Sequence, residues 1–200
     1  MSAPVFQILR ASLVLCLATL PGCAAAVRTD SASSYLIIDA LEAASGAKPD
    51  TFTGALASDV STKGTIYEDL AKVTLQLGMK DPGTATTPTT PSSANYITIT
   101  QYHVSFVRSD GRNTPGVDVP YAFDGAATVT VGASVTTAVV PLVRVQAKEE
   151  APLKALVGGN GAIAISTIAE VTFYGKDQAG RAVSVVGHIS VNFADWGDPS

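Results

Sequence analysis

The sequence predicts an all-β protein, a β-sandwich of about seven to nine strands with one short helical turn, preceded by an N-terminal signal peptide. Three observations lead to this fold class. Charged residues make up only 15% of the chain, and the abundance of Thr, Val, Ser and Gly favours strands over long helices. Apolar and polar residues alternate with a period of two in several stretches, and two matched stretches near the C-terminus flank a short turn.

Residues 1–22 have the parts of a signal peptide. Arg10 is the only charged residue among them, and an apolar run follows over residues 11–20. A membrane-spanning helix needs roughly 20 apolar residues, about twice the length of this run. The segment is therefore interpreted as a cleaved leader.

The leader ends in Leu20-Pro21-Gly22-Cys23, which resembles the lipobox of bacterial lipoproteins. The resemblance implies that a diacylglycerol is joined to the thiol of Cys23 and that the peptide is cut just before it. Ala24 after the cysteine implies the outer membrane of the bacterial cell envelope. The alternative is ordinary cleavage at residues 24–26, an A-x-A pattern, which would release a soluble secreted or periplasmic protein.

The segment 23–33, small and polar, is expected to be a flexible tether, and residues 34–200 are expected to form one domain. The only cysteine besides Cys23 is Cys16, inside the leader, so the mature chain has no pair of thiols to oxidise. The formal net charge is −4. An acidic domain of this kind is not expected to bind nucleic acid.

Strands are predicted along the first half of the domain. One covers Tyr35–Leu41, and a second covers Lys72–Met79, where four apolar residues alternate with polar ones or glycine. Weaker edge strands are predicted at Ala55–Ser58 and Thr65–Glu68.

The segment Tyr96–Arg108 predicts a strand whose buried face changes sides. Its apolar residues fall on odd positions before Thr100-Gln101 and on even positions after it. A β-bulge or a strand that crosses between sheets produces such a change. Further strands are predicted at Ala127–Val131 and Val135–Val145.

The clearest pattern is a C-terminal hairpin. Apolar residues recur on odd positions from Ile163 to Phe173 and again from Val183 to Phe193, with five turn-forming residues, 176–180, between them. The pattern predicts that these odd positions face the core.

Two segments between the strands stand out. Lys148–Val157 is predicted to form the one helical turn, because it begins with acidic residues and Pro152 and ends at two glycines. Lys80–Asn95 is rich in Thr, Pro and Ser without apolar periodicity. It predicts a long loop, functional or mobile, whose composition would also suit O-glycosylation.

From Tyr35 onward the chain resembles bacterial surface domains with an immunoglobulin-like sandwich. The stretch Gly175–Arg181 is similar to the D-x-x-G turn of their last hairpin, and Ser45–Phe52 and Gly111–Pro120 resemble segments of uncharacterised exported bacterial proteins. The resemblance implies an immunoglobulin-like Greek-key β-sandwich on an uncharacterised bacterial lipoprotein, and it implies no activity. The chain differs from antibody domains because it has no core cysteine pair.

The residues that could carry enzymatic chemistry are few. His103 and His188 are the only histidines, and both are predicted to face solvent or to pack locally. The chain contains no G-x-S-x-G, H-E-x-x-H or phosphate-loop motif. We therefore expect no catalytic residues, no cofactor and no metal site.

Oxygen-bearing side chains at Asp110, Asn113, Asp118 and Asp124 form the best candidate set for calcium. The alternative is that they satisfy backbone groups in turns, and we favour it because the spacing does not match an EF-hand.

Tyr121, Phe123 and Trp196 are the candidate ligand-binding residues, since exposed aromatic rings can stack on a sugar or a peptide. A hydrophobic plug at the end of the sandwich is the competing interpretation for the first two.

We therefore expect a lipid-anchored cell-envelope protein with a non-enzymatic binding or scaffolding role toward an envelope protein or a glycan. The alternatives are a carbohydrate-binding surface lipoprotein and a hydrolase whose site is invisible in the sequence.

Overall fold

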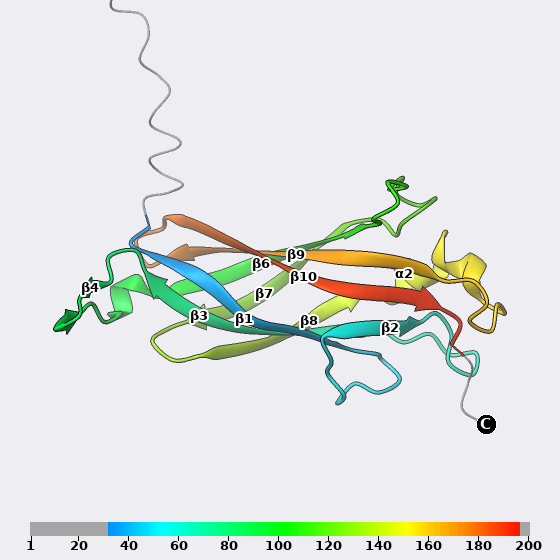
Figure 1. The fold of residues 1–200 in the computed structure, drawn as a ribbon, viewed down its shortest axis with the longest axis horizontal. Helices are drawn as coiled ribbons and strands as arrows, with labels where there is room; N and C mark the ends of the chain where they lie inside the picture. The colour runs from blue at the N-terminus through cyan, green and yellow to red at the C-terminus, as the bar shows by residue number, and fades with distance from the viewer. Residues whose placement is uncertain (1–31, 197–200) are drawn as a thin grey trace, which may run out of the picture.

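A computed structural model describes residues 32–196 (Figure 1). The fold is all-β, as predicted: two packed sheets contain eight strands, and a small hairpin projects from one end. The five-stranded sheet has the order β2-β10-β9-β6-β7, and the three-stranded sheet has the order β1-β3-β8. The strands are β1 (Ser34–Ala44), β2 (Ala55–Asp59), β3 (Asp69–Met79), β4 (Gly83–Thr84), β5 (Thr87–Pro88), β6 (Ile97–Val107), β7 (Phe123–Val131), β8 (Thr136–Val143), β9 (Ile165–Asp177) and β10 (Ala182–Ala194).

The hydrophobic core lies between the two sheets. Each sheet turns one side chain in two toward the other sheet, because successive side chains of a strand point to opposite faces. From the three-stranded sheet come Val73 and Leu75, and from the five-stranded sheet come Val171 and Phe173, all fully buried. The aromatic rings pack edge-on, as in the Phe106–Phe193 pair with centroids 5.5 Å apart.

The predicted C-terminal hairpin is confirmed as β9 and β10, which pair antiparallel over their whole length. Val171 and Val191 are buried and His188 is exposed, as the odd-inward register requires. The prediction was wrong at the start, because Ile163 precedes β9 and is 60% exposed. The turn is also shorter than predicted, since the strands run on to Asp177 and Ala182.

The buried carboxylate of Asp177 explains the short turn. It accepts hydrogen bonds from the backbone amides of Ala179 and Arg181, both at 2.9 Å. Gly180 completes the turn with a φ of 81°, a conformation that favours glycine.

The predicted change of face in β6 is confirmed as a bulge. Its pairing with both neighbours, β7 and β9, shifts register between Ile99 and Gln101. Ile99 before the bulge and Tyr102 after it are both buried. The extra residue therefore lets odd positions on one side of the bulge and even positions on the other face the same core.

The edge strands agree with the sequence in part. Ala55–Ser58 is confirmed as part of β2, which pairs parallel with the end of β10. The strand predicted at Thr65–Glu68 is wrong: the backbone amides and carbonyls of Thr62 and Thr65 bond each other across a tight turn. The strand predicted at Val135–Val145 is trimmed at both ends, to Thr136–Val143.

The single helical turn predicted at Lys148–Val157 is wrong in its bounds. The structure has two shorter turns, α2 (Val145–Glu149) and η2 (Leu153–Leu156). Pro152 explains the break, because proline has no amide hydrogen and disfavours helical backbone at the residue before it.

The loop predicted at Lys80–Asn95 is not structureless. It contains the small hairpin β4-β5 and one turn, η1 (Ser93–Asn95), and it projects from one end of the sheets (Figure 1). O-glycosylation of its threonines stays a prediction.

The predicted signal peptide, Cys23 and most of the predicted tether lie outside the described residues. The last two tether residues, however, belong to the domain: Ala32 is buried, and the Ser33 hydroxyl accepts a 2.8 Å hydrogen bond from the Asn95 amide. Within residues 32–196, helices are all too short or too polar to cross a lipid bilayer.

Candidate functional site

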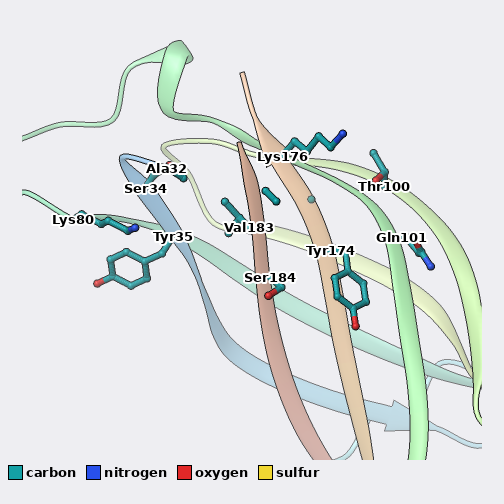
Figure 2. A pocket seen from close by; sticks show the side chains of 12 residues that line it. Ala32, Ser34, Tyr35, Lys80, Thr100, Gln101, Tyr174, Lys176, Val183 and Ser184 are labelled. Atoms are coloured by element: carbon teal, nitrogen blue, oxygen red, sulfur yellow. The ribbon is translucent and has the colours of Figure 1, made fainter. Parts of the chain in front are cut away.

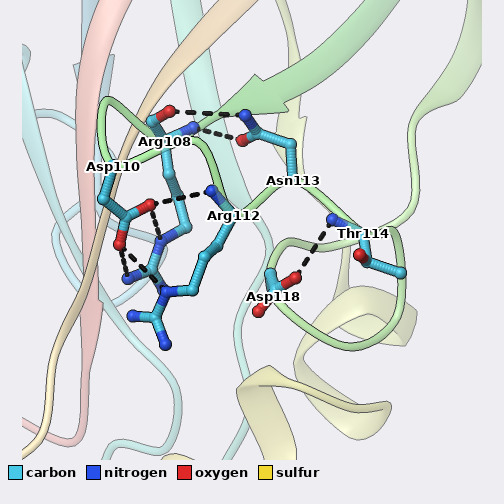
Figure 3. A network of polar contacts seen from close by, with 6 residues as sticks. All are labelled: Arg108, Asp110, Arg112, Asn113, Thr114 and Asp118. Atoms are coloured by element: carbon cyan, nitrogen blue, oxygen red, sulfur yellow. Dashed lines mark hydrogen bonds and ion pairs between the residues drawn. The ribbon is translucent and has the colours of Figure 1, made fainter.

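The calcium candidates do not converge on one point. The carboxylate of Asp110 accepts hydrogen bonds from the side chains of Arg108, at 2.6 and 3.1 Å, and Arg112, at 3.1 Å (Figure 3). These charged donors hold the pKa of Asp110 well below its usual range. Asn113 caps the backbone of Arg108, and Asp118 accepts from the backbone amide of Thr114 at 3.2 Å. The side-chain oxygens of Asp110, Asn113 and Asp118 thus accept hydrogen bonds from groups of their own loop.

Asp124 lies apart from that loop, on β7. Its Oδ1 is 2.9 Å from Nδ1 of His103 on β6. Over the described part of the chain, acidic, histidine and cysteine side chains nowhere gather in a group of three that could hold a metal ion.

Both histidines face a carboxylate. Besides the His103–Asp124 pair, Nε2 of His188 lies 3.4 Å from Oε1 of Glu170. These pairs lie on the outer face of the five-stranded sheet, opposite the core. Histidine and acid therefore do meet in space, but within residues 32–196 neither imidazole forms a hydrogen bond with a serine or threonine hydroxyl.

The three aromatic candidates are separated. Phe123 is buried, with the guanidinium of Arg144 4.1 Å above its ring. Its ring therefore fills the hydrophobic core and is not exposed for a ligand to stack on. Tyr121 is 55% exposed and borders a small pocket of about 130 Å³ beside Arg144. Trp196 borders a different hollow, of about 540 Å³, with Lys48. No shared binding surface forms among them.

A larger groove lies at the end of the domain where the described chain begins. It has a volume of about 710 Å³, within the range of small-ligand sites. Figure 2 shows Tyr35 and Lys80 on one side of β10, with Tyr174 and Gln101 on the other. Its lining residues are Ala32, Ser34, Tyr35, Lys80, Thr100, Gln101, Tyr174, Gly175, Lys176, Ala182, Val183 and Ser184.

Two glycines beside the tyrosines of the groove allow close packing. The Tyr35 ring lies over Gly78 of β3, where a Cβ atom would come within 2.5 Å of the ring. Next to Tyr174, Gly175 approaches the Thr98 carbonyl so closely that a Cβ would lie 2.6 Å from its oxygen. Only glycine permits these approaches, and at Gly78 the absence of a side chain leaves space for the Tyr35 ring. Tyr35 and Tyr174 are 44% and 41% exposed.

The β6 bulge supplies the third wall. Thr100 and Gln101, the two residues at the shift, both line the groove and are exposed. Bulges of this kind redirect side chains at functional sites. The parity change in the sequence was therefore a signal for this wall, whereas nothing in the sequence pointed to Tyr35 or Tyr174.

The groove combines polar and apolar groups and includes two lysines. They are Lys80 and Lys176, and none of the groove's lining residues within 32–196 is acidic. The chain as a whole has a net charge of −4. The groove is therefore suited to a ligand with negative or hydrogen-bond-accepting groups.

A second polar cluster lies inside the core at the opposite end. Nζ of Lys148 is 2.9 Å from Oδ2 of Asp69 and 2.8 Å from the carbonyl oxygen of Asp59. The Ser58 hydroxyl donates to Asp69 at 2.6 Å, and the Gly46 amide donates to it at 2.9 Å.

Burial raises the pKa of the Asp69 carboxyl, while Lys148 and the two hydrogen bonds oppose the rise. Asp69, Lys148 and Ser58 are all at most 1% exposed. The cluster therefore joins α2 to β2 and β3 and offers no hydroxyl to a substrate.

Comparisons with known proteins found no matching family model, no matching curated protein and no matching solved structure.

Proposed function

We propose that this chain is a lipid-anchored protein of the bacterial cell envelope whose β-sandwich domain has a non-enzymatic binding role. The anchor rests on the sequence Leu20-Pro21-Gly22-Cys23. The binding role rests on the groove between Tyr35 and Tyr174, which is the observation that carries this proposal.

We further propose an immunoglobulin-like Greek-key arrangement for the sandwich. The order β1-β3-β8 matches strands A, B and E of that fold, and β10-β9-β6-β7 matches G, F, C and C′. In this correspondence β2 is a second segment of the first strand, which leaves β1 and joins β10 in the other sheet. The segments that end at the groove are then the N-terminus and the loop between β9 and β10.

The groove supports binding because its components favour recognition over reaction. It has two partly exposed aromatic rings, and hydroxyl and amide groups at Ser34, Thr100, Gln101 and Ser184. Aromatic faces stack on ligands and the polar groups set their orientation. Among the lining residues that the structure describes, the titratable side chains are the two tyrosines and two lysines, so this part of the chain supplies the groove with neither carboxylate nor imidazole for general acid-base catalysis.

A carbohydrate is the second candidate ligand, and we propose that it binds in the groove and not at the residues predicted from the sequence. Exposed tyrosine rings beside amide and hydroxyl groups suit a sugar, and Tyr35, Tyr174 and Gln101 provide them here. Tyr121, which was selected from the sequence, serves as the control in its test.

The test is a glycan array together with a displayed peptide library, probed with purified wild-type protein, Tyr174→Ala and Tyr121→Ala. We expect ligands that bind the wild type and Tyr121→Ala alike and that lose most of their binding to Tyr174→Ala. Both substituted rings are about half exposed, so neither change should unfold the domain. Ligands that ignore Tyr174→Ala, or no ligand of either class, would refute the groove as the binding site.

A further inference from the structure

A second hollow lies at the end of the domain opposite the groove. It has a volume of about 540 Å³, which is within the range of small-ligand sites. Its walls come from the loop between β1 and β2, from β2 itself, and from the chain that follows β10. β2 runs beside the C-terminal end of β10 (Figure 1), so segments far apart in the sequence border one space.

Short side chains keep this hollow open. Four alanines line it, and two of them, Ala55 and Ala57, are exposed on the edge strand β2. The indole of Trp196 forms a further wall and is 36% exposed. A broad aromatic surface beside short apolar side chains favours a flat apolar group as the ligand.

Hydrogen bonds hold the chain at Trp196 against its neighbours. The Trp196 amide donates to Oδ1 of Asp59 on β2 at 3.1 Å. The carboxylate of the preceding residue, Asp195, accepts from the amide of Gly158, which follows η2, at 2.5 Å. The indole therefore borders the hollow from a backbone that is tied on two sides.

The two charged residues of the hollow differ in their partners. Asp59 is the acidic one among the described lining residues, and its carboxylate already accepts hydrogen bonds from the amides of Ser61 and Trp196 and from the hydroxyl of Thr62. Lys48 is exposed, and its amine forms no ion pair within residues 32–196. The charge that remains for a ligand is therefore positive.

The edge of β2 adds a backbone donor. The amide of Val60 donates to the Ala194 carbonyl at 3.0 Å, and in a parallel pair every second residue bonds the partner strand. The backbone groups of Ala57 and Asp59 therefore point away from β10. The Asp59 carbonyl accepts from Lys148 on that side, whereas over the described part of the chain no strand or side chain pairs with the Ala57 amide.

We propose that this hollow binds a small aromatic carboxylate. The ring of the ligand lies against Trp196 and the alanines, and its carboxylate pairs with the amine of Lys48, with the Ala57 amide as a further donor. The hollow and the groove share no lining residue. The inference therefore goes beyond the binding function proposed for the groove and does not depend on it.

The test uses Trp196 as its reporter, because it is the only tryptophan of the chain. The full-length protein in phosphatidylcholine vesicles is titrated with 3-phenylpropionate and with its uncharged amide while tryptophan emission is followed. We expect a saturable change, with the carboxylate bound about fivefold more tightly than the amide. That factor corresponds to about 1 kcal/mol, as for an exposed ion pair.

Two variants separate the charge from the space. Lys48→Gln should bind the carboxylate and the amide equally, whereas the exposed control Lys154→Gln should keep the fivefold preference. Ala57→Leu should weaken both ligands about tenfold or more, since the added isopropyl group takes the space of the ring. Its control is Ala126→Leu, at an exposed position of the other edge strand, β7, which should bind like the wild type.

NMR of the wild type gives a measurement that needs no variant. In detergent-free lipid, 3-phenylpropionate should shift the signals of the Trp196 indole N–H and the Ala57 amide, and it should leave those of Tyr35 and Tyr174 in place.

The inference is overturned if neither the emission nor these two signals respond, or if Ala57→Leu binds as tightly as the wild type. Equal binding of the carboxylate and the amide by the wild type would overturn the anionic class of the ligand. All of these results leave ligand binding through Tyr174 untouched, so the groove and the hollow succeed or fail separately.

Discussion

At the residue scale, the buried Asp69–Lys148 pair is the main polar feature of the core. Desolvating two charges is costly, and the attraction between them offsets that cost only when the remaining donors and acceptors are satisfied. Here Ser58, Gly46 and the carbonyl of Asp59 satisfy them. The pair therefore positions α2 against β2 and β3 as well as stabilising the fold.

Lys148→Met is expected to lower the free energy of unfolding by about 3 to 5 kcal/mol, because it leaves the Asp69 carboxylate buried without its charge partner. Adding Asp69→Leu to it should recover part of that loss. The control is Lys154→Met, an exposed lysine in the next turn, which should change stability by under about 0.5 kcal/mol. Urea unfolding of the three variants measures this, and equal losses for both lysines would contradict a structural ion pair.

Asp110 gives a prediction on pH. Its pKa is lowered from the usual 3.8 by Arg108 and Arg112, so its clamp is present above that value and is lost only as the pH falls through the lower, folded-state pKa. We expect the Asp110 carboxyl group, followed by the chemical shift of its carbon in NMR, to stay ionised below pH 3.8. Arg108→Gln with Arg112→Gln should raise this pKa toward 3.8, with the part due to the backbone amide of residue 112 retained. An unchanged titration would show that the guanidinium groups are not the cause.

At the element scale, the register of the β9-β10 hairpin is open to a paired test. Phe173→Ala should cost about 3 to 5 kcal/mol, because the buried ring leaves a cavity. Thr172→Ala, one residue away on the opposite face, should cost under about 1 kcal/mol. Urea midpoints of the two variants decide it, and a larger loss at Thr172 would mean that the register is shifted by one residue.

Elements defined by alternation could be predicted from the sequence. The parity of residues 165–173 and 183–193 determined the hairpin, and the parity change at Thr100-Gln101 located the bulge, because one buried face leaves a period of two in the chain. The helix was misjudged since Pro152 can begin a helical turn or interrupt one, and the choice depended on Lys148 turning into the core. Residues of this kind are decided by tertiary contacts.

The candidate site could be predicted only in part. The bulge residues that form one wall carried a signal. Tyr35 on β1 and Tyr174 on β9 did not, since they are far apart in the chain and line one groove only because β1 runs beside β10, which pairs with β9 in the other sheet. Tyr121 and Phe123 were predicted as ligand-binding residues because they are neighbouring aromatic residues in the sequence. In the structure Phe123 faces the core and Tyr121 faces solvent.

At the scale of the whole molecule, the groove and the start of the domain share one end. The described chain begins at Ala32 beside the groove. β10 runs from the groove at Ala182 to the opposite end of the sandwich at Ala194 (Figure 1), and Trp196 follows it there. Ser33 and Ser34 are held by hydrogen bonds to Asn95. If Cys23 is the anchor, as we propose, residues 24–31 connect the lipid to the end of the domain that carries the groove.

The measurement that tests the anchored binding protein most directly is metabolic labelling with a tagged fatty acid, followed by fractionation. We predict that wild-type protein carries the label and stays with the membrane, whereas Cys23→Ala carries none and moves to the soluble fraction. An unlabelled wild-type protein, together with Cys23→Ala that remains in the membrane fraction, would contradict the account.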